Sequence, residues 1–99
     1  MIVRMNGSFA AVVEPARRQL LELLLRAPLP VGELVAATGM SQPNTSRHLG
    51  ILRKAGLVTS RAAGKRRLYE VRPEGFAELA DWLTPYVLLM QGGRDSSKA

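Results

Sequence analysis

Residues 42–55 carry the side chains best suited to bind a nucleic acid. One side of the predicted helix has hydrogen-bonding and cationic groups, the kinds that contact base edges and phosphates. These residues are Gln42, Ser46, Arg47, Gly50, Arg53 and Lys54. The opposite side has Thr45, Leu49, Leu52 and Ala55 at helical spacing, so we expect it to pack inward. Ser41 and Pro43 suit the start of this helix and Gly56 suits its end. An isolated helix of this kind is more often simply a solvated surface, so the surrounding sequence must decide.

The positive charge of the chain is concentrated around this helix. The whole sequence has 14 Lys and Arg, 8 Asp and Glu, and a formal net charge of +6. Residues 41–72 hold eight basic side chains and one acidic side chain, a net charge of +7, whereas the remainder holds six basic and seven acidic. Such a one-sided distribution favours a polyanionic partner over a role in solubility.

Length and composition narrow the possible classes of protein. A chain of 99 residues suits a single domain over 1–99, and we expect flexible tails at 1–7 and 92–99. No apolar run is long enough for a membrane span, and the first residues lack a signal-peptide pattern, so we expect a cytoplasmic protein. The absence of Cys excludes disulfides, thiolate metal sites and cysteine nucleophiles. With one His and no glycine-rich phosphate loop, an enzyme is the least favoured class.

Two helices are predicted near the start of the chain. Residues 8–13 form a short helix, and residues 15–27 form a second helix with Pro at its first position. Leucines between 20 and 25 lie nearly all round the second helix, so we expect it to be the central helix of the core. Arg17 and Arg18 lie near its start, where we expect them to be solvated or to touch a phosphate.

A third helix is predicted just before the basic helix of residues 42–55, and the two together match a known motif. Residues 31–38 have apolar side chains at i, i+3, i+4 and i+7, and a tight turn over 39–41 follows. Two short helices joined by a three-residue turn that contains Gly form a helix-turn-helix, in which residues 42–55 are the recognition helix.

A basic β-hairpin is predicted directly after the recognition helix. Residues 57–60 and 66–71 have strand composition, and residues 62–65 suit the turn between them. Four cations cluster at its tip, namely Arg61, Lys65, Arg66 and Arg67. The predicted fold is therefore mainly α: a winged helix-turn-helix with about five helices and a two-stranded antiparallel wing, which lies along the DNA backbone or in the minor groove.

The two ends of the chain carry more apolar surface than one small core absorbs. Residues 72–75 open a last helix, which we expect Pro85 to kink or divide. We infer that the first and last helices pair across a two-fold axis in a homodimer, and the alternative is that they cover residues 20–25 of their own chain. The interface residues expected are Phe9, Val12, Val13, Trp82, Tyr86, Leu89 and Met90.

These features together resemble the ArsR family of bacterial winged-helix repressors, from about Phe9 to Leu83. The segments that carry the resemblance are Phe9-Ala10-Ala11-Val12, Glu14-Pro15-Ala16-Arg17-Arg18, Val31-Gly32-Glu33-Leu34, Ser41-Gln42-Pro43, Ser46-Arg47-His48-Leu49, Leu52-Arg53, Ala55-Gly56-Leu57-Val58 and Gly64-Lys65-Arg66-Arg67-Leu68-Tyr69. The resemblance implies homodimeric repressors that bind operators near their own promoters. It also implies dimerisation through the first and last helices.

The sequence departs from the metal-sensing members of that family. Many of them hold a metal through a cysteine pair on the helix that corresponds to residues 31–38, and here that helix has no sulfur ligand. The carboxylates Glu74, Glu78 and Asp81 are read as an exposed polar face, with a hard-cation site as the lesser alternative. We therefore predict no metal and no cofactor, and no small-molecule effector is assigned.

The predicted contacts with double-stranded DNA fall into two groups. We expect base edges or adjacent phosphates to be contacted by Gln42, Asn44, Ser46 and Arg47, and phosphates by Lys54, Arg61, Lys65, Arg66 and Arg67. Thr45 either packs or reaches a phosphate, and His48 either contacts a phosphate or fixes its helix to a neighbour. The main rival is a winged-helix module that binds a protein and no operator. An RNA-binding role is weaker because few aromatic side chains are free to stack on bases.

Overall fold

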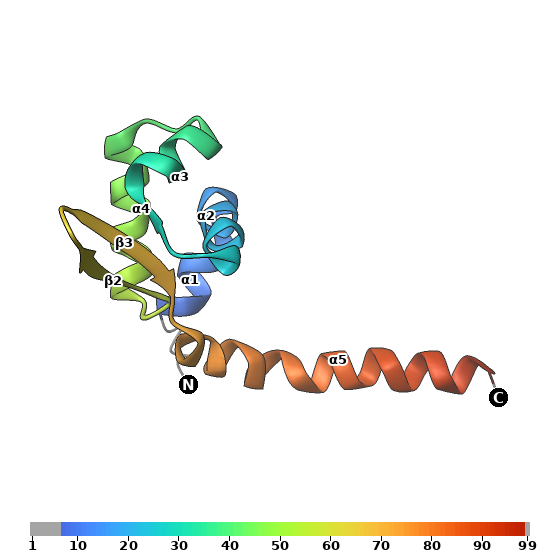
Figure 1. Cartoon of the computed structure of the whole chain (residues 1–99). Helices are drawn as coiled ribbons and strands as arrows, with labels where there is room; N and C mark the ends of the chain where they lie inside the picture. The colour runs from blue at the N-terminus through green and yellow to red at the C-terminus, as the bar shows by residue number, and fades with distance from the viewer. Residues whose placement is uncertain (1–6, 99) are drawn as a thin grey trace.

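The computed structural model describes residues 7–98, and the side chains of 7–92, as a small body from which one long helix projects (Figure 1). The predicted tail over 1–7 lies outside the described residues except for Gly7. The elements in chain order are α1 (Gly7–Val13), α2 (Pro15–Arg26), β1 (Leu29–Pro30), α3 (Val31–Thr38), α4 (Gln42–Lys54), β2 (Val58–Ala63), β3 (Arg66–Val71), the 3-10 turn η1 (Pro73–Phe76) and α5 (Ala77–Lys98).

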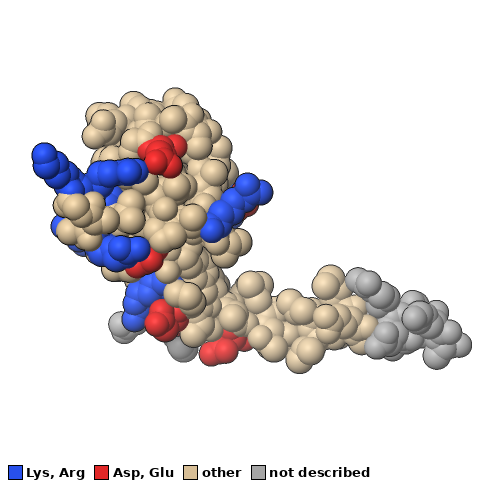
Figure 2. All heavy atoms as spheres, in the orientation of Figure 1, with Lys and Arg blue, Asp and Glu red and all other residues tan. Residues whose placement is uncertain are grey.

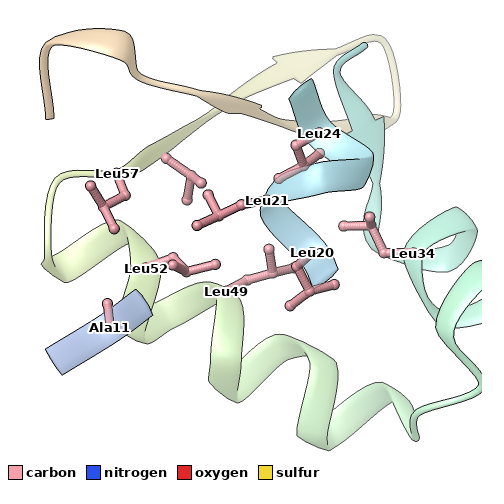
Figure 3. Packing of buried hydrophobic residues seen from close by; sticks show 9 residues of the cluster. Ala11, Leu20, Leu21, Leu24, Leu34, Leu49, Leu52 and Leu57 are labelled. Atoms are coloured by element: carbon pink, nitrogen blue, oxygen red, sulfur yellow. The ribbon is translucent and has the colours of Figure 1, made fainter. Parts of the chain in front are cut away.

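The core lies between α2 and α4 and is closed by the other elements of the body (Figure 3). Its buried members are Ala11, Leu20, Leu21, Leu24, Leu34, Leu49, Leu52, Leu57 and Val58. Leu49 and Leu52 are the inward residues that helical spacing predicts for α4. The prediction that α2 is the central helix of the core is confirmed by the burial of Leu20, Leu21 and Leu24. Its leucines are not all covered, because Leu25 is 77% exposed and Leu23 is half-buried. α2 packs against α1, α3, α4 and β3, and Leu25 lies on the side that none of them covers.

The helix-turn-helix is formed by α3 and α4, as the sequence predicts. Gly39 ends α3 with a φ of 77°, in the left-handed region that favours glycine. The side chain of Ser41 caps α4 by accepting a hydrogen bond from the Asn44 amide at 3.2 Å. After the last residue of α4 and its C-cap Ala55, Gly56 adopts a φ of 80°, the left-handed backbone that commonly follows a helix end.

The wing belongs to a three-stranded sheet rather than the predicted two-stranded one. Antiparallel β2 and β3 pair over six residues, and β1 adds to the outer side of β3, where Leu29 faces Tyr69. The two prolines around Leu29 suggested a connector. Pro30 is tolerated in a strand because β1 is an edge strand that needs no donor on its open side. β2 is also longer than predicted, so the turn is the two-residue Gly64-Lys65 with Gly64 at a φ of 65°.

The last helix, α5, runs from Ala77 to Lys98 and leads away from the body (Figure 1). The prediction that Pro85 divides it is wrong, since the helix continues through this residue. Thr84, beside Pro85, donates from its hydroxyl to the carbonyl of Ala80 at 2.6 Å. Residues 92–98 are the end of the same helix, so their predicted flexibility stays a prediction. Within the described part of the chain, no helix is long and apolar enough to cross a membrane.

Candidate nucleic-acid interface

The outward side of α4 forms an open basic surface. The polar and cationic side chains that the sequence places there are all exposed, namely Gln42, Ser46, Arg47, Arg53 and Lys54. Arg47, Gly50, Ile51, Arg53 and Lys54 line a hollow of about 460 Å³ on this side. A Cβ placed on Gly50 would meet nothing within 4 Å, so a ligand has direct access to the backbone there. The helix therefore offers donors and positive charge without steric obstruction.

Arg47 is held by a polar contact on the same surface. Its Nη2 donates to the Oδ1 of Asn44 at 3.0 Å, and the Nδ2 of Asn44 lies 3.8 Å from the sulfur of Met40. The amide of Asn44 is thereby oriented from the turn before α4 and in turn orients Arg47. A guanidinium held in this way retains donors for a carbonyl or phosphate oxygen.

Thr45 and His48 are placed inward, which removes both from the predicted contact set. Thr45 is fully buried, and its hydroxyl donates to the Ser41 carbonyl at 2.8 Å. His48 is 5% exposed, and its Nδ1 lies 3.1 Å from Nη1 of Arg17. Of the alternatives open for His48, the structure favours the one in which it fixes α4 to a neighbouring helix. Thr45 and His48 lie on the same buried side of α4 as Leu49 and Leu52. On that side, the side chains of Thr45 and His48 have no access to a phosphate.

The environment of His48 disfavours its protonated form. Burial lowers the pKa of His48 below its ordinary value of 6.5, and the positive charges of Arg47 and Arg17 lower it further. The carboxylate of Glu14 opposes these effects. These effects favour the neutral imidazole.

Arg17 and Arg18 have a structural role that the sequence reading missed. The last four carbonyls of an α-helix lack partners within the helix. Arg17 donates to the carbonyls of Ala11 (2.7 Å, from Nε) and Ala10 (3.3 Å), and Arg18 donates to those of Val12 (2.6 Å) and Val13 (2.9 Å). The two guanidinium groups thus cap the whole last turn of α1. A helix that ends at residue 13 without a glycine, followed by two arginines, was the signal available in the sequence.

The cations of the wing are only partly committed to other groups. Arg61 pairs with Glu70 at 3.3 Å, and Arg66 of β3 pairs with Glu33 of α3 at 3.0 Å. Arg67 donates to the hydroxyl of Ser60 at 3.1 Å. Lys65 lies in the exposed turn, and none of the ion pairs recorded among the described residues includes it. In Figure 2 the blue Lys and Arg atoms gather over the wing and its surroundings, whereas the described part of α5 is mostly tan.

The residues predicted for a dimer interface are divided between contacts within the chain and exposed surface. Phe9 packs edge-on against Trp82 with the ring centroids 5.4 Å apart, and Trp82 lies 5.0 Å from Tyr86. Val12 is half-buried against the core. The exposed members are Val13, Trp82, Tyr86, Leu89 and Met90, joined on α5 by Leu83, Val87 and Leu88. The alternative that all of these cover α2 of their own chain fails for α5, which projects from the body (Figure 1).

The acidic side chains near the start of α5 do not form a recognised metal cluster. Among the residues that the structure describes, no group of three or more His, Cys, Asp or Glu side chains lies close enough to hold a metal ion. This includes Glu74, Glu78 and Asp81. The absence of a metal site remains a prediction.

The helix pair, the three-stranded sheet with its wing and the basic side of α4 define a winged helix-turn-helix protein. Residues 14–60 match the family described as bacterial regulatory protein, arsR family. The HTH-type transcriptional regulator Rv2034 of Mycobacterium tuberculosis is 42% identical over 74 residues, which are 75% of this chain and 69% of that protein. The chain belongs to the ArsR family, as its resemblance predicts.

Other relatives and solved structures agree with this family. The uncharacterized HTH-type transcriptional regulator Rv0081 of Mycobacterium tuberculosis is 39% identical over 72% of this chain, and the match spans 63% of that relative. The crystal structure of a possible transcriptional regulator for arsenical resistance has a TM-score of 0.74 at 34% identity, covering 84% of this chain and 85% of that one. The homodimeric winged helix-turn-helix DNA-binding domain of Mb0332 from Mycobacterium bovis has a TM-score of 0.68 at 30% identity. The match covers 82% of this chain and 75% of that one.

Proposed function

We propose that this protein is a homodimeric transcriptional repressor that binds a two-fold symmetric DNA operator in the bacterial cytoplasm, where the chromosome lies. The observation that carries the proposal is the exposed basic side of α4, with Arg47 and Lys54 around the open backbone of Gly50. Its membership of the ArsR family and the homodimeric solved relative support the proposal. No enzymatic activity, metal or cofactor forms part of it.

In the proposed complex α4 enters the major groove. The side chains assigned to base edges and nearby phosphates are Gln42, Asn44, Ser46 and Arg47. Those assigned to the phosphate backbone are Lys54, Arg61, Lys65, Arg66 and Arg67. Arg61 and Arg66 must exchange carboxylate partners for phosphates, or share them, on binding. The wing then lies along the backbone or over the minor groove.

A second copy of the chain would cover the apolar side of α5. That helix exposes Trp82, Tyr86 and Leu89 to water, and such a continuous apolar surface marks an interface between proteins. A two-fold dimer places its two recognition helices about 34 Å apart, so that they enter successive major-groove faces. The operator expected is accordingly a pair of inverted half-sites.

Binding to selected DNA across a salt series tests this function. The purified protein is used to enrich duplexes from a random-sequence pool, and its affinity for the enriched duplex and for a scrambled copy is compared with that for DNA upstream of its own gene. Inverted repeats, a large specific-to-scrambled ratio and steep salt dependence support a dimeric repressor. Weak and equal binding to every duplex contradicts it and favours the rival module that binds a protein, as does unchanged function after Arg47 and Lys65 are both neutralised.

A further inference from the structure

The guanidinium of Arg17 lies between two helices and bonds to both. It donates from Nε to the Ala11 carbonyl at 2.7 Å and from Nη2 to the Ala10 carbonyl at 3.3 Å, both in the last turn of α1. Its Nη1 lies 3.1 Å from the Nδ1 of His48, in the middle of α4. One side chain of α2 therefore fastens the end of α1 to the recognition helix.

Each end of this connection is well placed to matter for DNA binding. His48 follows Arg47 directly, and successive residues of a helix point about 100° apart, so the buried side of α4 at His48 sets the direction in which Arg47 points. At the other end, α1 contacts α5 through Phe9 and Trp82 at 5.4 Å. These contacts thus connect α5, which we assign to the dimer interface, through α1 and Arg17 to α4, which we assign to DNA.

We propose that Arg17 is a positioning residue for DNA recognition: through His48 it holds α4 in a fixed orientation relative to α1, and so couples the recognition helix to the surface on which two copies pair. This inference rests on the function proposed above. It assigns Arg17 no contact with DNA, and so excludes the phosphate contact that the sequence left open for this residue.

The bond to His48 requires a neutral imidazole. A guanidinium has only donors, so Nδ1 must accept and the ring proton must lie on Nε2. A second proton would occupy Nδ1, remove the acceptor and place two cations in contact. The charged groups that act on His48 are Arg47 of its own helix, Arg17 of α2, and Glu14, which directly precedes α2. α1 has no titratable side chain over Gly7–Val13, while Glu33 of α3 and Arg61 of β2 are paired elsewhere.

Arg18 provides a matched control for Arg17. Both arginines donate to two carbonyls at the end of α1, but none of the hydrogen bonds recorded for Arg18 among the described residues reaches α4. Arg17→Met and Arg18→Met therefore remove the same kind of helix cap and the same charge, and keep a similar apolar stem. Only Arg17→Met removes the bond to His48.

The experiment measures specific binding and the state of His48 in the same set of proteins. An untagged chain has a single histidine, so one set of imidazole signals in a nuclear magnetic resonance titration reports the tautomer and pKa of His48. The duplex enriched from the random pool, and its scrambled copy, are the DNA probes. The proteins are the wild type, Arg17→Met, Arg18→Met, His48→Leu and His48→Asn, in which the amide oxygen replaces Nδ1 as an acceptor that does not titrate.

We expect Arg17→Met and His48→Leu each to lower the specific-to-scrambled ratio about tenfold, within the usual range of coupling between sites. A sixth protein, the double variant Arg17→Met/His48→Leu, should lose little more than either single variant, because both substitutions remove the same bond. Arg18→Met should stay within about twofold of the wild type at matched salt. His48→Asn should keep most of the wild-type ratio. We also expect the wild type to lose discrimination at low pH, as His48 becomes protonated, and His48→Asn to lack this loss.

Two results overturn the inference when the wild type discriminates between the duplexes. One is an equal ratio for Arg17→Met and Arg18→Met. The other is a His48 titration that Arg17→Met leaves unchanged, which would mean that the two side chains do not interact in solution. A failure of the proposed function is different, because it appears in the wild type itself as equal binding to both duplexes.

Discussion

The backbone of Gly75 lies directly against the carbonyl group of Gly56. A Cβ at residue 75 would overlap both the oxygen and the carbon of that carbonyl, and would lie 3.2 Å from the Cα of Leu57. The contact joins Gly56, two residues after the end of α4, to the 3-10 turn η1 that precedes α5. The nearby amide of Arg72 donates to the Leu57 carbonyl at 2.8 Å, which closes the same junction. The backbone just before α5 is therefore packed against the end of the recognition-helix segment with no room for a side chain at residue 75.

Gly75→Ala should destabilise the protein, because the atoms it would strike are backbone atoms that cannot turn aside. Overpacking of this kind costs about 1–3 kcal/mol in the free energy of unfolding. Urea unfolding at one fixed protein concentration measures the loss. Gly32→Ala is the control: a Cβ there meets nothing within 4 Å, and an alanine inside α3 should be neutral or stabilise by up to about 1 kcal/mol. Equal stability for the two variants would refute the role given to this contact.

Arg47→Ala should weaken binding to the selected duplex more than binding to its scrambled copy. A guanidinium that contacts a base edge contributes about 1–3 kcal/mol of discrimination, whereas a phosphate contact contributes to both duplexes alike. Asn44→Ala removes the acceptor that holds Arg47 at 3.0 Å, so it should lose part of the same discrimination. The losses of affinity for the two duplexes are compared with those of Arg53→Ala, which removes a cation from the same exposed side of α4. Equal losses on both duplexes for Arg47→Ala would assign it to the backbone instead.

Lys65→Ala should weaken binding to both duplexes alike and lower the slope of log affinity against log salt by about one unit. Lys65 lies at the exposed wing turn, whereas Arg66 is already paired with Glu33 at 3.0 Å. Glu33→Gln should therefore strengthen binding to both duplexes modestly, because it frees Arg66 and removes a negative charge. Both side chains of the Glu33–Arg66 ion pair are exposed, so Glu33→Gln should change the free energy of unfolding by less than about 1 kcal/mol. A salt slope that Lys65→Ala leaves unchanged would exclude the wing tip from the complex.

Much of the fold follows from local signals in the sequence. Gly39 and Gly56 have the left-handed backbone that a helix end requires, and Ser41 caps α4, so α3 and α4 are where apolar spacing places them. The third strand could not be predicted in the same way. Leu29 and Pro30 form β1 only because β3, almost forty residues later, offers its free edge, and such pairing has no local signal.

The candidate site was predictable on its exposed side and less so on its buried side. Residue type and helical spacing placed Arg47 and Lys54 outward correctly. His48 lies at the boundary of the two sides, and its direction depends on Arg17, thirty-one residues away in the chain. For Arg17 and Arg18 the sequence predicted side chains that are solvated or touch a phosphate. The two arginines that follow a helix end without glycine hinted at caps, but which carbonyls they bind depends on how α1 packs beside α2.

Leu89→Glu should dissociate the proposed dimer without unfolding the protomer. Leu89 is 74% exposed, so a charge there costs little in a monomer but is buried without a partner in a dimer. Sedimentation over a concentration series should show a monomer, and binding to a duplex with two half-sites should fall to the level of one half-site. Gln91→Glu adds the same charge at an exposed polar position two residues away and should remain dimeric. A dimeric Leu89→Glu protein would place the interface elsewhere.

The stability of the wild type should fall as the pH is lowered from neutral through about 6.5. His48 has an ordinary pKa of 6.5 in the unfolded chain and a lower pKa when folded, because of burial and of the charges of Arg47 and Arg17. Between these two values the unfolded state binds more protons than the folded state, so the free energy of unfolding decreases with falling pH. The contribution of His48 is complete above 6.5 and its loss stops once the folded protein is also protonated. Urea unfolding at a series of pH values between 5 and 8 measures it, with His48→Asn as the variant that lacks the titration. Parallel curves for the two proteins would show that His48 titrates in the folded state as it does in the unfolded chain, contrary to its buried position beside Arg17.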